Sequence, residues 1–526
     1  MKPAVKSLLL LLCLQTLAAY AQSVSQFKHV VIIFQENRTP DNLFNPLTPK
    51  CTMNPTTCTT TLTNTCYDIA TCGLSKQSGT DVAIPLTSVL LANTYDLSHK
   101  HAAFVQMCDA NSSGACQNDG AYGITCTPNQ GTTCPTNPQY KFVDNSTRTI
   151  QPYIDMATQY GWANAMFQTN QGPSFPAHQF IFGGTSAPTA LDDSNGIFIS
   201  ENPGAPMGAN YVAGRDTGCL APLNEFNTEI SPNAGNCPTG CTCFNNNTVK
   251  ECKITNNPLG GLCFKHATVP TLLSNPVTSW KYYGPKVTTN PGGSNPEGSI
   301  WMAPASITDI CQPDPTYTTC TGPAFTGPNP NVDLNPADVL VDIGNCALAN
   351  VVWVIPKGQN SDHPGGNGGG PAWVASIVNA IGNDSGVNAK CDLTNPNPGY
   401  WNDTAIIITW DDWGGWTDHV PPTILAGNQG TYQYGFRVPL VVVSAWTAQG
   451  YINNSQHDFG SILRLIENVF NIEEGALNFA DARASNDLRN FFSLTSPRGF
   501  TPINASLSAS FFINDTTPAT FPDDDN

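Results

Sequence analysis

Two apolar stretches far apart in the sequence each end in a pair of oxygen-bearing side chains. The stretch HVVIIFQEN ends at Glu36 and Asn37, and the stretch TAIIITWDD ends at Asp411 and Asp412. Runs rich in Val and Ile are typical of parallel strands that helices cover on both sides. Open α/β sheets bind ligands beyond the carboxyl ends of their strands, so we expect both pairs to reach one crevice. Three carboxylates crowded there repel one another unless a cation neutralises them, and the sequence therefore predicts a metal-dependent enzyme.

Other segments show the patterns of strands and helices that would position these pairs. Apolar runs predict strands at Val30–Phe34, Asn350–Ile355, Ala405–Thr409 and Val438–Val443, and a weaker one at Gln179–Phe182. Apolar residues at helical spacing predict helices at Pro371–Gly382 and Gly460–Phe470, and a helix-like patch at Thr87–Gln106 that we assign to the core. Strands that alternate with helices favour an α/β sandwich.

The strand signals extend over most of the chain, which favours one large interrupted domain. We predict a single domain over residues 22–500, with insertions near residues 45–145 and 201–267 that are rich in Cys, Asn, Thr, Gly and Pro. Residues 501–526 are expected to form a loosely attached tail.

The first 21 residues have the pattern of a secretory signal peptide. Lys2 and Lys6 precede a short apolar run, and Ala19-Tyr20-Ala21 matches a cleavage site. No later run approaches the roughly 20 apolar residues of a membrane helix, so we expect a secreted protein, extracellular or periplasmic; an uncleaved signal that anchors the chain is the alternative.

Without the signal the chain has 20 basic and 39 acidic residues, which disfavours nucleic acid as a partner.

The cysteines indicate an oxidising compartment. Of 19 cysteines, Cys13 lies in the signal peptide, and the remaining 18 are an even number that predicts disulfides in an exported chain. The dense group of Cys237, Cys241 and Cys243 could alternatively form a zinc site. Disulfides are the stronger interpretation, because the chain is expected to be exported and other cysteines lie nearby.

Six motifs in order along the chain resemble those of bacterial phosphoesterases of the phospholipase C and acid phosphatase type. They are QENRTPDNLF (Gln35–Phe44), GPSFPAHQFIFGG (Gly172–Gly184), SWKYYG (Ser279–Gly284), SDHPGG (Ser361–Gly366), TWDDWGGWTDHVPP (Thr409–Pro422) and FRVPLVVVSAW (Phe436–Trp446). The resemblance covers nearly the whole mature chain outside the insertions. It implies an alkaline-phosphatase-like three-layer α/β/α sandwich.

The resemblance also implies roles for individual residues. Glu36, Asn37, Asp411 and Asp412 would be metal ligands, and Ser174 would be both the nucleophile and a further ligand. A serine hydroxyl is a poor nucleophile until a base or a cation stabilises its alkoxide. The alternative for Ser174, which follows a turn signal, is a helix N-cap without chemistry. An all-oxygen ligand set favours Ca²⁺, Mg²⁺ or Mn²⁺ and leaves the identity of the ion open.

The eight histidines divide into three groups. His99 and His363 match motif histidines of the family, which would bind phosphoryl oxygens or protonate the leaving group, and His101 lies close enough to His99 to confuse the assignment. His178 and His419 also belong to motifs, where an orienting role is as reasonable as a catalytic one. The remaining three we interpret as structural or surface residues: His29, His266 and His457.

The chain departs from the family pattern at several positions. Thr39-Pro40 replaces Ser-Phe, and Asn42 and Trp413 stand where histidines are common. Other members also have histidines near the SWKYYG segment, and this chain has none there. These departures affect the leaving-group acid and the substrate pocket more than the metal site. The tryptophans near Asp411 could form a choline-binding face by cation–π contact, or pack in the core: Trp410, Trp413 and Trp416.

The sequence thus predicts a secreted metal-dependent phosphoric ester hydrolase with a phosphoserine intermediate. Its substrate would be a phosphate monoester or a phospholipid, and the sequence does not decide its oligomeric state. A non-catalytic secreted binding protein on the same fold is the alternative. A sulfatase or phosphonate hydrolase is disfavoured because the chain has no sulfatase-type Cys-x-Pro-x-Arg segment.

Overall fold

The computed structural model describes residues 24–519, apart from residues 78, 113, 130, 203–217, 221–226, 231–240, 247–248, 255–262, 274–277, 287–298, 317–318, 395 and 424–433. The predicted signal peptide, the side chains of Cys237, Cys241 and Cys243, and most of the insertion at residues 201–267 lie outside the described part. No helix of the described part is long and apolar enough to cross a lipid bilayer.

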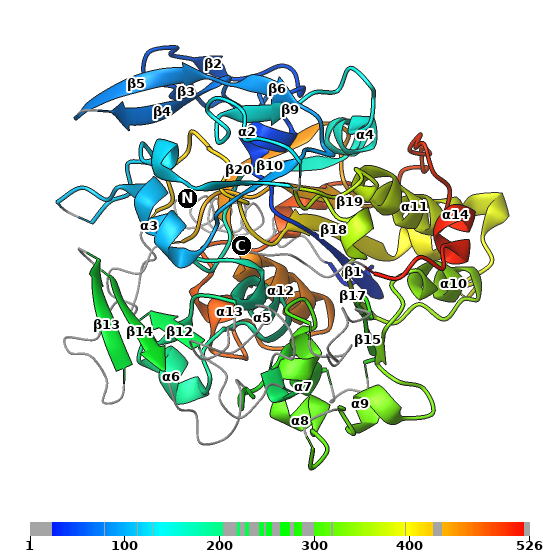
Figure 1. Ribbon diagram of the computed structural model, residues 1–526. Coiled ribbons are helices and arrows are strands. Elements are labelled where there is room, and N and C mark those ends of the chain that lie inside the picture. Colours follow the sequence, from blue (N-terminus) through cyan, green and yellow to red (C-terminus); the bar gives the residue numbers. More distant parts are fainter. Residues whose placement is uncertain are drawn as a thin grey trace, which may run out of the picture.

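An eight-stranded sheet forms the centre of the molecule (Figure 1). Its strands, in spatial order, are β16 (Val332–Asp333), β15 (Trp280–Tyr283), β17 (Val351–Val354), β1 (His29–Gln35), β18 (Thr404–Trp410), β19 (Leu440–Val443), β10 (Gly161–Met166) and β20 (Tyr451–His457). All neighbours are parallel except β19, which is antiparallel to both β18 and β10.

The four strands predicted from apolar runs are present as β1, β17, β18 and β19. The weaker strand prediction at Gln179–Phe182 is wrong, because these residues lie within helix α5 (Ser174–Gly183). All ten residues of α5 are buried, and a helix that is apolar all round has no amphipathic pattern to distinguish it from a strand.

The register of β1 and β18 brings the two polar pairs together. Gln35 lies opposite Trp410, so the residues that follow each strand are neighbours. The backbone continues this pairing beyond the strands, since the Asp411 N–H donates to the Gln35 carbonyl at 2.9 Å and the Arg38 N–H donates to the Asp412 carbonyl at 3.0 Å. The two pairs therefore lie side by side beyond the carboxyl ends of β1 and β18, as expected, although they are buried and do not line an open crevice.

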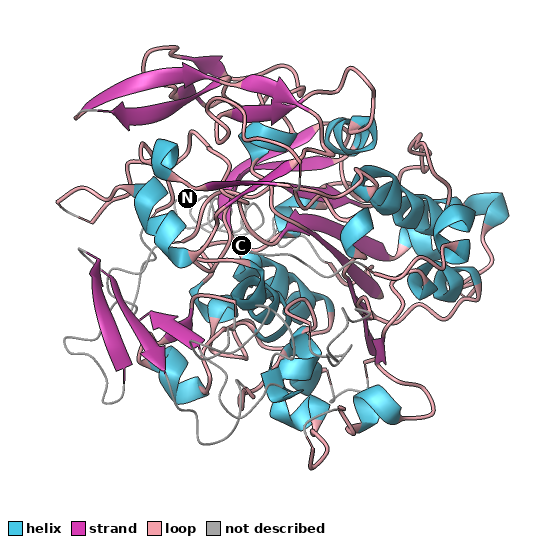
Figure 2. Cartoon of the chain, in the orientation of Figure 1, coloured by secondary structure: helices cyan, strands magenta, loops and turns pink. Residues whose placement is uncertain are grey.

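Helices cover both faces of the sheet, as the contacts of one side chain on each face show. On one face, Phe34 packs edge-on against Phe459 of α12 (Phe459–Val469) and against His178 of α5. On the other face, Trp410 packs against Tyr153 of α4 (Gln151–Gln159). Figure 2 shows the helices on either side of the strands, so the predicted α/β class with three layers is confirmed.

The remaining helices are short, apart from α11 (Gly370–Asn383), which confirms the helix predicted at Pro371–Gly382, as α12 confirms that at Gly460–Phe470. They are α2 (Pro40–Leu43), α3 (His101–Cys108), α6 (Ala190–Ser194), α7 (Val269–Leu272), α8 (Thr308–Cys311), α9 (Pro323–Thr326), α10 (Asp338–Gly344), α13 (Ala480–Arg483) and α14 (Ala509–Asn514).

The segment of residues 45–145 forms small two-stranded sheets over one edge of the molecule (Figure 1). Its strands are β2 (Thr52–Met53), β3 (Thr60–Thr61), β4 (Cys72–Gln77), β5 (Thr80–Pro85), β6 (Thr87–Val89), β7 (Tyr95–Leu97), β8 (Cys126–Pro128) and β9 (Lys141–Val143). The patch at Thr87–Gln106 is helical only from His101 onward, and Tyr95, Leu97 and Phe104 in it belong to a second apolar cluster instead of the main core.

Disulfides join the described cysteines in seven pairs. They are Cys51–Cys66, Cys58–Cys72, Cys108–Cys116, Cys126–Cys134, Cys219–Cys263, Cys311–Cys320 and Cys346–Cys391. Four of them lie in the first insertion. In the second, strands β12 (Asn227–Ile230), β13 (Cys241–Asn246) and β14 (Val249–Ile254) form a sheet with β11 (Phe198–Ile199).

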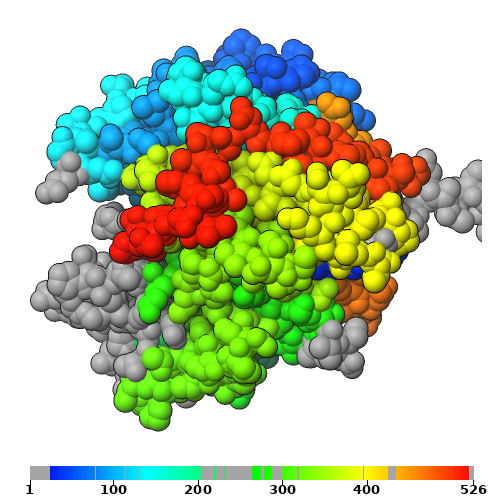
Figure 3. Space-filling view, turned by 90° about the vertical axis from the view of Figure 1, so that its right-hand side faces the viewer, coloured from blue at the N-terminus to red at the C-terminus, as the bar shows by residue number. Residues whose placement is uncertain are grey.

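The C-terminal segment packs on the protein, which corrects the expectation of a loosely attached tail. Phe512 of α14 is buried against Trp373, with ring centroids 5.2 Å apart. The Lys357 ammonium donates to the carbonyls of Asp515 and Thr517 at 2.9 and 3.0 Å. Figure 3 shows this red segment lying across the yellow and green parts of the chain.

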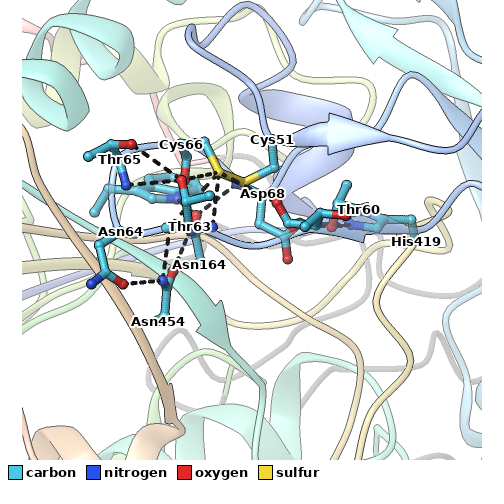
Figure 4. The surroundings of a disulfide bond; sticks show 12 residues. Cys51, Thr60, Thr63, Asn64, Thr65, Cys66, Asp68, Asn164, His419 and Asn454 are labelled. Atoms are coloured by element: carbon cyan, nitrogen blue, oxygen red, sulfur yellow. Dashed lines mark hydrogen bonds and ion pairs between the residues drawn. A yellow bond between two sulfur atoms is a disulfide. The ribbon is translucent and has the colours of Figure 1, made fainter.

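A buried network of charges ties the first insertion to the core. Arg437 lies 3.4 Å from Asp41, 3.2 Å from Asp68 and 3.0 Å from Asp418, and His419 bridges Asp41 and Asp68 at 2.8 and 3.0 Å. Asp68 belongs to the insertion and lies between the Cys51–Cys66 disulfide and His419 (Figure 4).

For Asp68 and His419, charge pairing outweighs burial. Burial alone would raise the pKa of Asp68, but the hydrogen bond with His419 and the charge of Arg437 lower it to about 2. Burial would likewise lower the pKa of His419, yet the charge of Asp41 and the hydrogen bonds to Asp41 and Asp68 raise it to about 10. Both side chains are therefore charged at neutral pH.

We predict that Arg437→Met lowers the free energy of unfolding by about 3–5 kcal/mol, because it removes one counterion from a group of three buried carboxylates. Urea unfolding of the oxidised protein measures the change. Arg489→Met is the matched control, since Arg489 is 40% exposed and pairs with Glu474 at the surface, and it should change stability by less than about 1 kcal/mol. Equal effects of the two substitutions would contradict the anchoring role of Arg437.

Candidate active site

The two polar pairs form a fully buried group beyond the ends of β1 and β18. Glu36, Asn37, Asp411 and Asp412 each have 0% exposure. The Asp411 Oδ1 atom accepts from the Asn37 backbone N–H at 2.9 Å and from the Asp412 N–H at 2.7 Å. Backbone donors thus fix one carboxylate and stabilise its charged form.

A glycine makes the close approach of the two turns possible. Asn37 has a φ of 61°, and Gly414 faces it with the same positive φ. A Cβ on Gly414 would lie 2.4 Å from the Asn37 carbonyl oxygen, which is too close for any other residue. The Gly414 N–H also donates to the Asp412 carboxylate at 2.7 Å, so the WDDWGG sequence holds both turns together.

Ser174 begins helix α5 and directs its hydroxyl at the carboxylates. Pro173 is the N-cap residue, and Ser174 is the first residue of α5. The Ser174 Oγ lies 3.3 Å from Glu36 Oε2 and 3.4 Å from Asp412 Oδ2. The alternative interpretation of Ser174 as a simple N-cap is therefore wrong.

Gln168, which the motifs did not single out, holds the turn before Ser174. Its side-chain amide donates to the carbonyls of Asn170 and Gly172 at 3.0 and 3.1 Å. Its carbonyl oxygen accepts from the Trp413 N–H at 3.2 Å, directly after Asp412. One buried amide thus joins the serine turn to the carboxylate turn. Only the fold brings these segments together, so sequence reasoning had no signal for this contact.

The structure separates the two neighbouring histidines of the YDLSHKH segment. His99 Nδ1 donates to the Leu97 carbonyl at 2.7 Å, which leaves Nε2 to accept from the Asn37 amide at 3.1 Å. His101 instead contacts the Gln171 carbonyl through Nδ1 at 2.8 Å. His363 completes the group, with its ring 6.2 Å from that of His99.

His178 reaches the same carboxylates from α5. Its Nε2 lies 3.3 Å from Glu36 Oε1, and its Nδ1 lies 3.5 Å from the Tyr282 hydroxyl. The sequence placed His178 in a motif without deciding its role. The ligand atoms of Glu36, His178 and Asp411 all lie within 4.8 Å of one another, so these three residues could hold a metal ion.

Arg38 lies beside the site, where its hydrogen bonds hold neighbouring loops in place. Its guanidinium donates to the Asp362 carbonyl at 2.9 Å and to Asn42, Leu91 and Asn93 at 3.2 Å each. Asn42, where the family pattern led us to expect a histidine, therefore has a structural partner in this chain. Burial lowers the pKa of Arg38 to about 10, which keeps it charged at neutral pH.

Asp362 fixes the turn that carries His363. Its carboxylate accepts from the Tyr153 hydroxyl at 2.8 Å and from the Trp410 indole at 3.0 Å. Burial raises the pKa of Asp362 to about 6, against the opposing effects of the Tyr153 hydrogen bond and the Arg38 charge.

The three tryptophans near Asp411 pack inside the protein. Trp410, Trp413 and Trp416 each have 0% exposure, and Trp413 packs against Phe436 with ring centroids 5.1 Å apart. They form no exposed choline-binding face, in agreement with the core alternative.

The predicted site residues therefore converge. Direct contacts join Ser174 to Glu36 and Asp412, Asn37 to Asp411 and His99, and His178 to Glu36. Three carboxylates, an amide and a hydroxyl in one buried volume are a donor set that fits a divalent cation.

The chain matches a protein family and several known proteins. The Phosphoesterase family matches residues 27–473. Over 207 residues the chain is 31% identical to the non-hemolytic phospholipase C of Burkholderia pseudomallei, an alignment that spans 34% of this chain and 28% of that protein. Phospholipase C A of Mycobacterium tuberculosis is 27% identical over 191 residues, 32% of this chain and 34% of that protein.

A plant protein and a solved structure are also similar. Non-specific phospholipase C6 of Arabidopsis thaliana is 30% identical over 123 residues, 20% of this chain and 24% of that protein. A crystal structure of a protein in the alkaline phosphatase superfamily from Vibrio parahaemolyticus aligns with a TM-score of 0.27 and 10% identity, over 62% of this chain and 61% of that one. These alignments with curated relatives span about a third or less of their lengths. The family match covers most of the chain, and the chain belongs to the Phosphoesterase family.

Proposed function

We propose that this protein hydrolyses phosphoric esters through a phosphoserine intermediate on Ser174, with a divalent metal held by Glu36, Asn37, Asp411 and Asp412. The observation that carries the proposal is the position of the Ser174 hydroxyl, between the Glu36 and Asp412 carboxylates at the start of a buried helix. Family membership and relatives named phospholipase C support the choice of a phosphate ester as substrate.

The reaction has two displacements. The Ser174 Oγ attacks phosphorus and forms a new P–O bond while the bond to the leaving alcohol breaks, and the serine proton passes to a neighbouring base or to water. Water then attacks the phosphoserine and releases the phosphate product with Ser174 restored. When bound, the cation would stabilise the serine alkoxide and neutralise charge on the phosphoryl oxygens.

The histidines take different parts in this scheme. His99 accepts from the Asn37 amide through Nε2, so we assign to it the orientation of Asn37. His363 holds its Nδ1 against the Pro364 carbonyl at 2.8 Å and is 8% exposed, so its Nε2 is our candidate for contact with the phosphoryl group or the leaving oxygen.

Phosphate monoesters and phospholipids are both candidate substrates. The phospholipase C names of the relatives favour a phospholipid, whereas the burial of the tryptophans removes one expected choline contact. The disulfides and the N-terminal sequence support action outside the cytoplasm. Turnover of p-nitrophenyl phosphate, bis-p-nitrophenyl phosphate and phosphatidylcholine by the purified protein decides between them, and no turnover of any would favour the non-catalytic binding protein.

Ser174→Ala should abolish turnover and leave folding intact, because it removes the nucleophile. Loss of a nucleophile usually costs several powers of ten in rate, so more than about a tenth of the activity remaining would exclude this role. Acid quenching with labelled substrate should trap phosphate on the wild-type protein and none on the variant. Ser376→Ala is the matched control, since Ser376 is a buried serine that donates to the Trp373 carbonyl in α11.

Exhaustive chelation should remove activity and lower the melting temperature, because a ligand that binds only the native state stabilises it. Asp412→Asn should reduce bound metal, measured by elemental analysis, together with the rate. Asp342→Asn, which alters a carboxylate paired with Lys281 elsewhere in the protein, should change neither. Full activity in a protein with no bound metal would assign acid-base roles to the carboxylates instead.

Gln168→Leu should lower kcat by about 10–100-fold, because small misplacements of a reacting group have effects of this size. The variant should stay folded and should keep its bound metal. Gln179→Leu serves as the control, since Gln179 is a buried glutamine of α5 whose side-chain amide has no hydrogen-bond partner among the described residues. An unchanged kcat for Gln168→Leu would show that the bridge between the two turns is not needed for the reaction.

A further inference from the structure

Helix α5 presents two residues to the same carboxylate. Ser174 and His178 are one helical turn apart and therefore lie on one face of the helix. Ser174 Oγ contacts Glu36 Oε2, and His178 Nε2 contacts Glu36 Oε1, both at 3.3 Å. The Glu36 carboxylate thus lies between a hydroxyl and an imidazole, and each of its oxygens faces a polar atom of α5.

The contacts of His178 determine which of its nitrogens carries a proton. The Tyr282 hydroxyl has one proton and donates it to the Trp301 carbonyl at 2.5 Å. Tyr282 must therefore accept from His178, so the Nδ1 of His178 carries the proton. A neutral imidazole of this tautomer presents the lone pair of Nε2 to the Glu36 carboxylate.

A metal cation between the Nε2 lone pair and the Glu36 carboxylate would stabilise both of these electron-rich groups. His178, Glu36 and Asp411 are each fully buried, and one ligand atom from each lies within 4.8 Å of the others. Donors bound to one ion at about 2.0–2.3 Å and at right angles are about 2.8–3.3 Å apart. The separation of 3.3 Å between His178 Nε2 and Glu36 Oε1 agrees with this spacing.

We infer that His178 binds the divalent metal directly through Nε2, and that Tyr282 fixes its tautomer from the second shell of the site. The inference rests on the metal site of the proposed function and adds a ligand to it. A nitrogen donor makes the site a mixed one, which favours Zn²⁺ or Fe²⁺ over Ca²⁺, because Ca²⁺ takes oxygen ligands. The expectation of an all-oxygen site is revised accordingly.

Metal affinity, measured without turnover, tests this ligand. Equilibrium dialysis of the metal-free protein with Zn²⁺ and, separately, with Ca²⁺ gives two affinities for each variant. His178→Gln should weaken Zn²⁺ binding by at least about 100-fold and Ca²⁺ binding by less than about 3-fold, because only Zn²⁺ depends strongly on the imidazole. Tyr282→Phe should weaken Zn²⁺ binding by about 10-fold, as the loss of a second-shell partner typically does.

A matched control and a second readout keep the test independent of folding defects. His457→Gln removes another buried histidine, which contacts Asn453 away from the site, and should leave both affinities unchanged. Pulsed electron paramagnetic resonance of the Mn²⁺-loaded wild-type protein should detect a coupled histidine nitrogen, and the coupling should be absent from His178→Gln.

The outcomes separate this inference from the proposed function. Equal weakening of Zn²⁺ and Ca²⁺ binding by His178→Gln would show that His178 only orients Glu36, and the inference would be wrong. A nitrogen coupling that persists in His178→Gln would also overturn it. Activity that survives Ser174→Ala would refute the phosphoserine mechanism while leaving the assignment of His178 intact.

Discussion

The close burial of three carboxylates, away from solvent, is the constraint on which the rest of this structure depends. Glu36, Asp411 and Asp412 have no exposure to solvent, and the parallel register of β1 and β18 forces them together. Burial disfavours each charge and proximity disfavours all three, so the ionised forms require compensating donors and a cation. The protein supplies the donors from backbone N–H groups of the two turns and from the Ser174 hydroxyl.

Two buried arginines stabilise the surroundings without entering the site. Arg38 binds carbonyl and amide oxygens of three separate segments, and Arg437 binds carboxylates of the insertion and of the segment after β18. Each arginine is fully buried, so each holds loops in place from inside the protein. The disulfide-linked insertion is thus part of the framework of the site. Residues Asn93 and His99, on the segment that follows its first disulfides, contact Arg38 and Asn37.

The local sequence pattern was sufficient to predict some strands of the sheet and insufficient to predict others. Strands β1 and β18 are buried on both faces and read as continuous runs of Val and Ile. Strand β20, YINNSQH, and strand β10, GWANAM, have no such run, and their place in the sheet depends on pairing with each other and with β19. The carboxylates were found from the ends of the two apolar runs, and Ser174 was found from the order of the motifs. Gln168 was missed, and Asp362 was given no role although it lies in the SDHPGG motif, because the partners of both side chains are far away in the sequence.

The departures from the family pattern have a common consequence. Asn42 binds Arg38 and donates to the Lys141 carbonyl, and Trp413 packs between Phe104 and Phe436, so both positions have become parts of the framework. Neither can donate a proton to a leaving group. His99 contacts the Asn37 amide, and His178 faces Glu36. In the proposed reaction this leaves His363, the partly exposed histidine of the group, or water to protonate the leaving alcohol. The general acid of the reaction is therefore to be sought at the SDHP turn, which Asp362 and Arg38 hold in place.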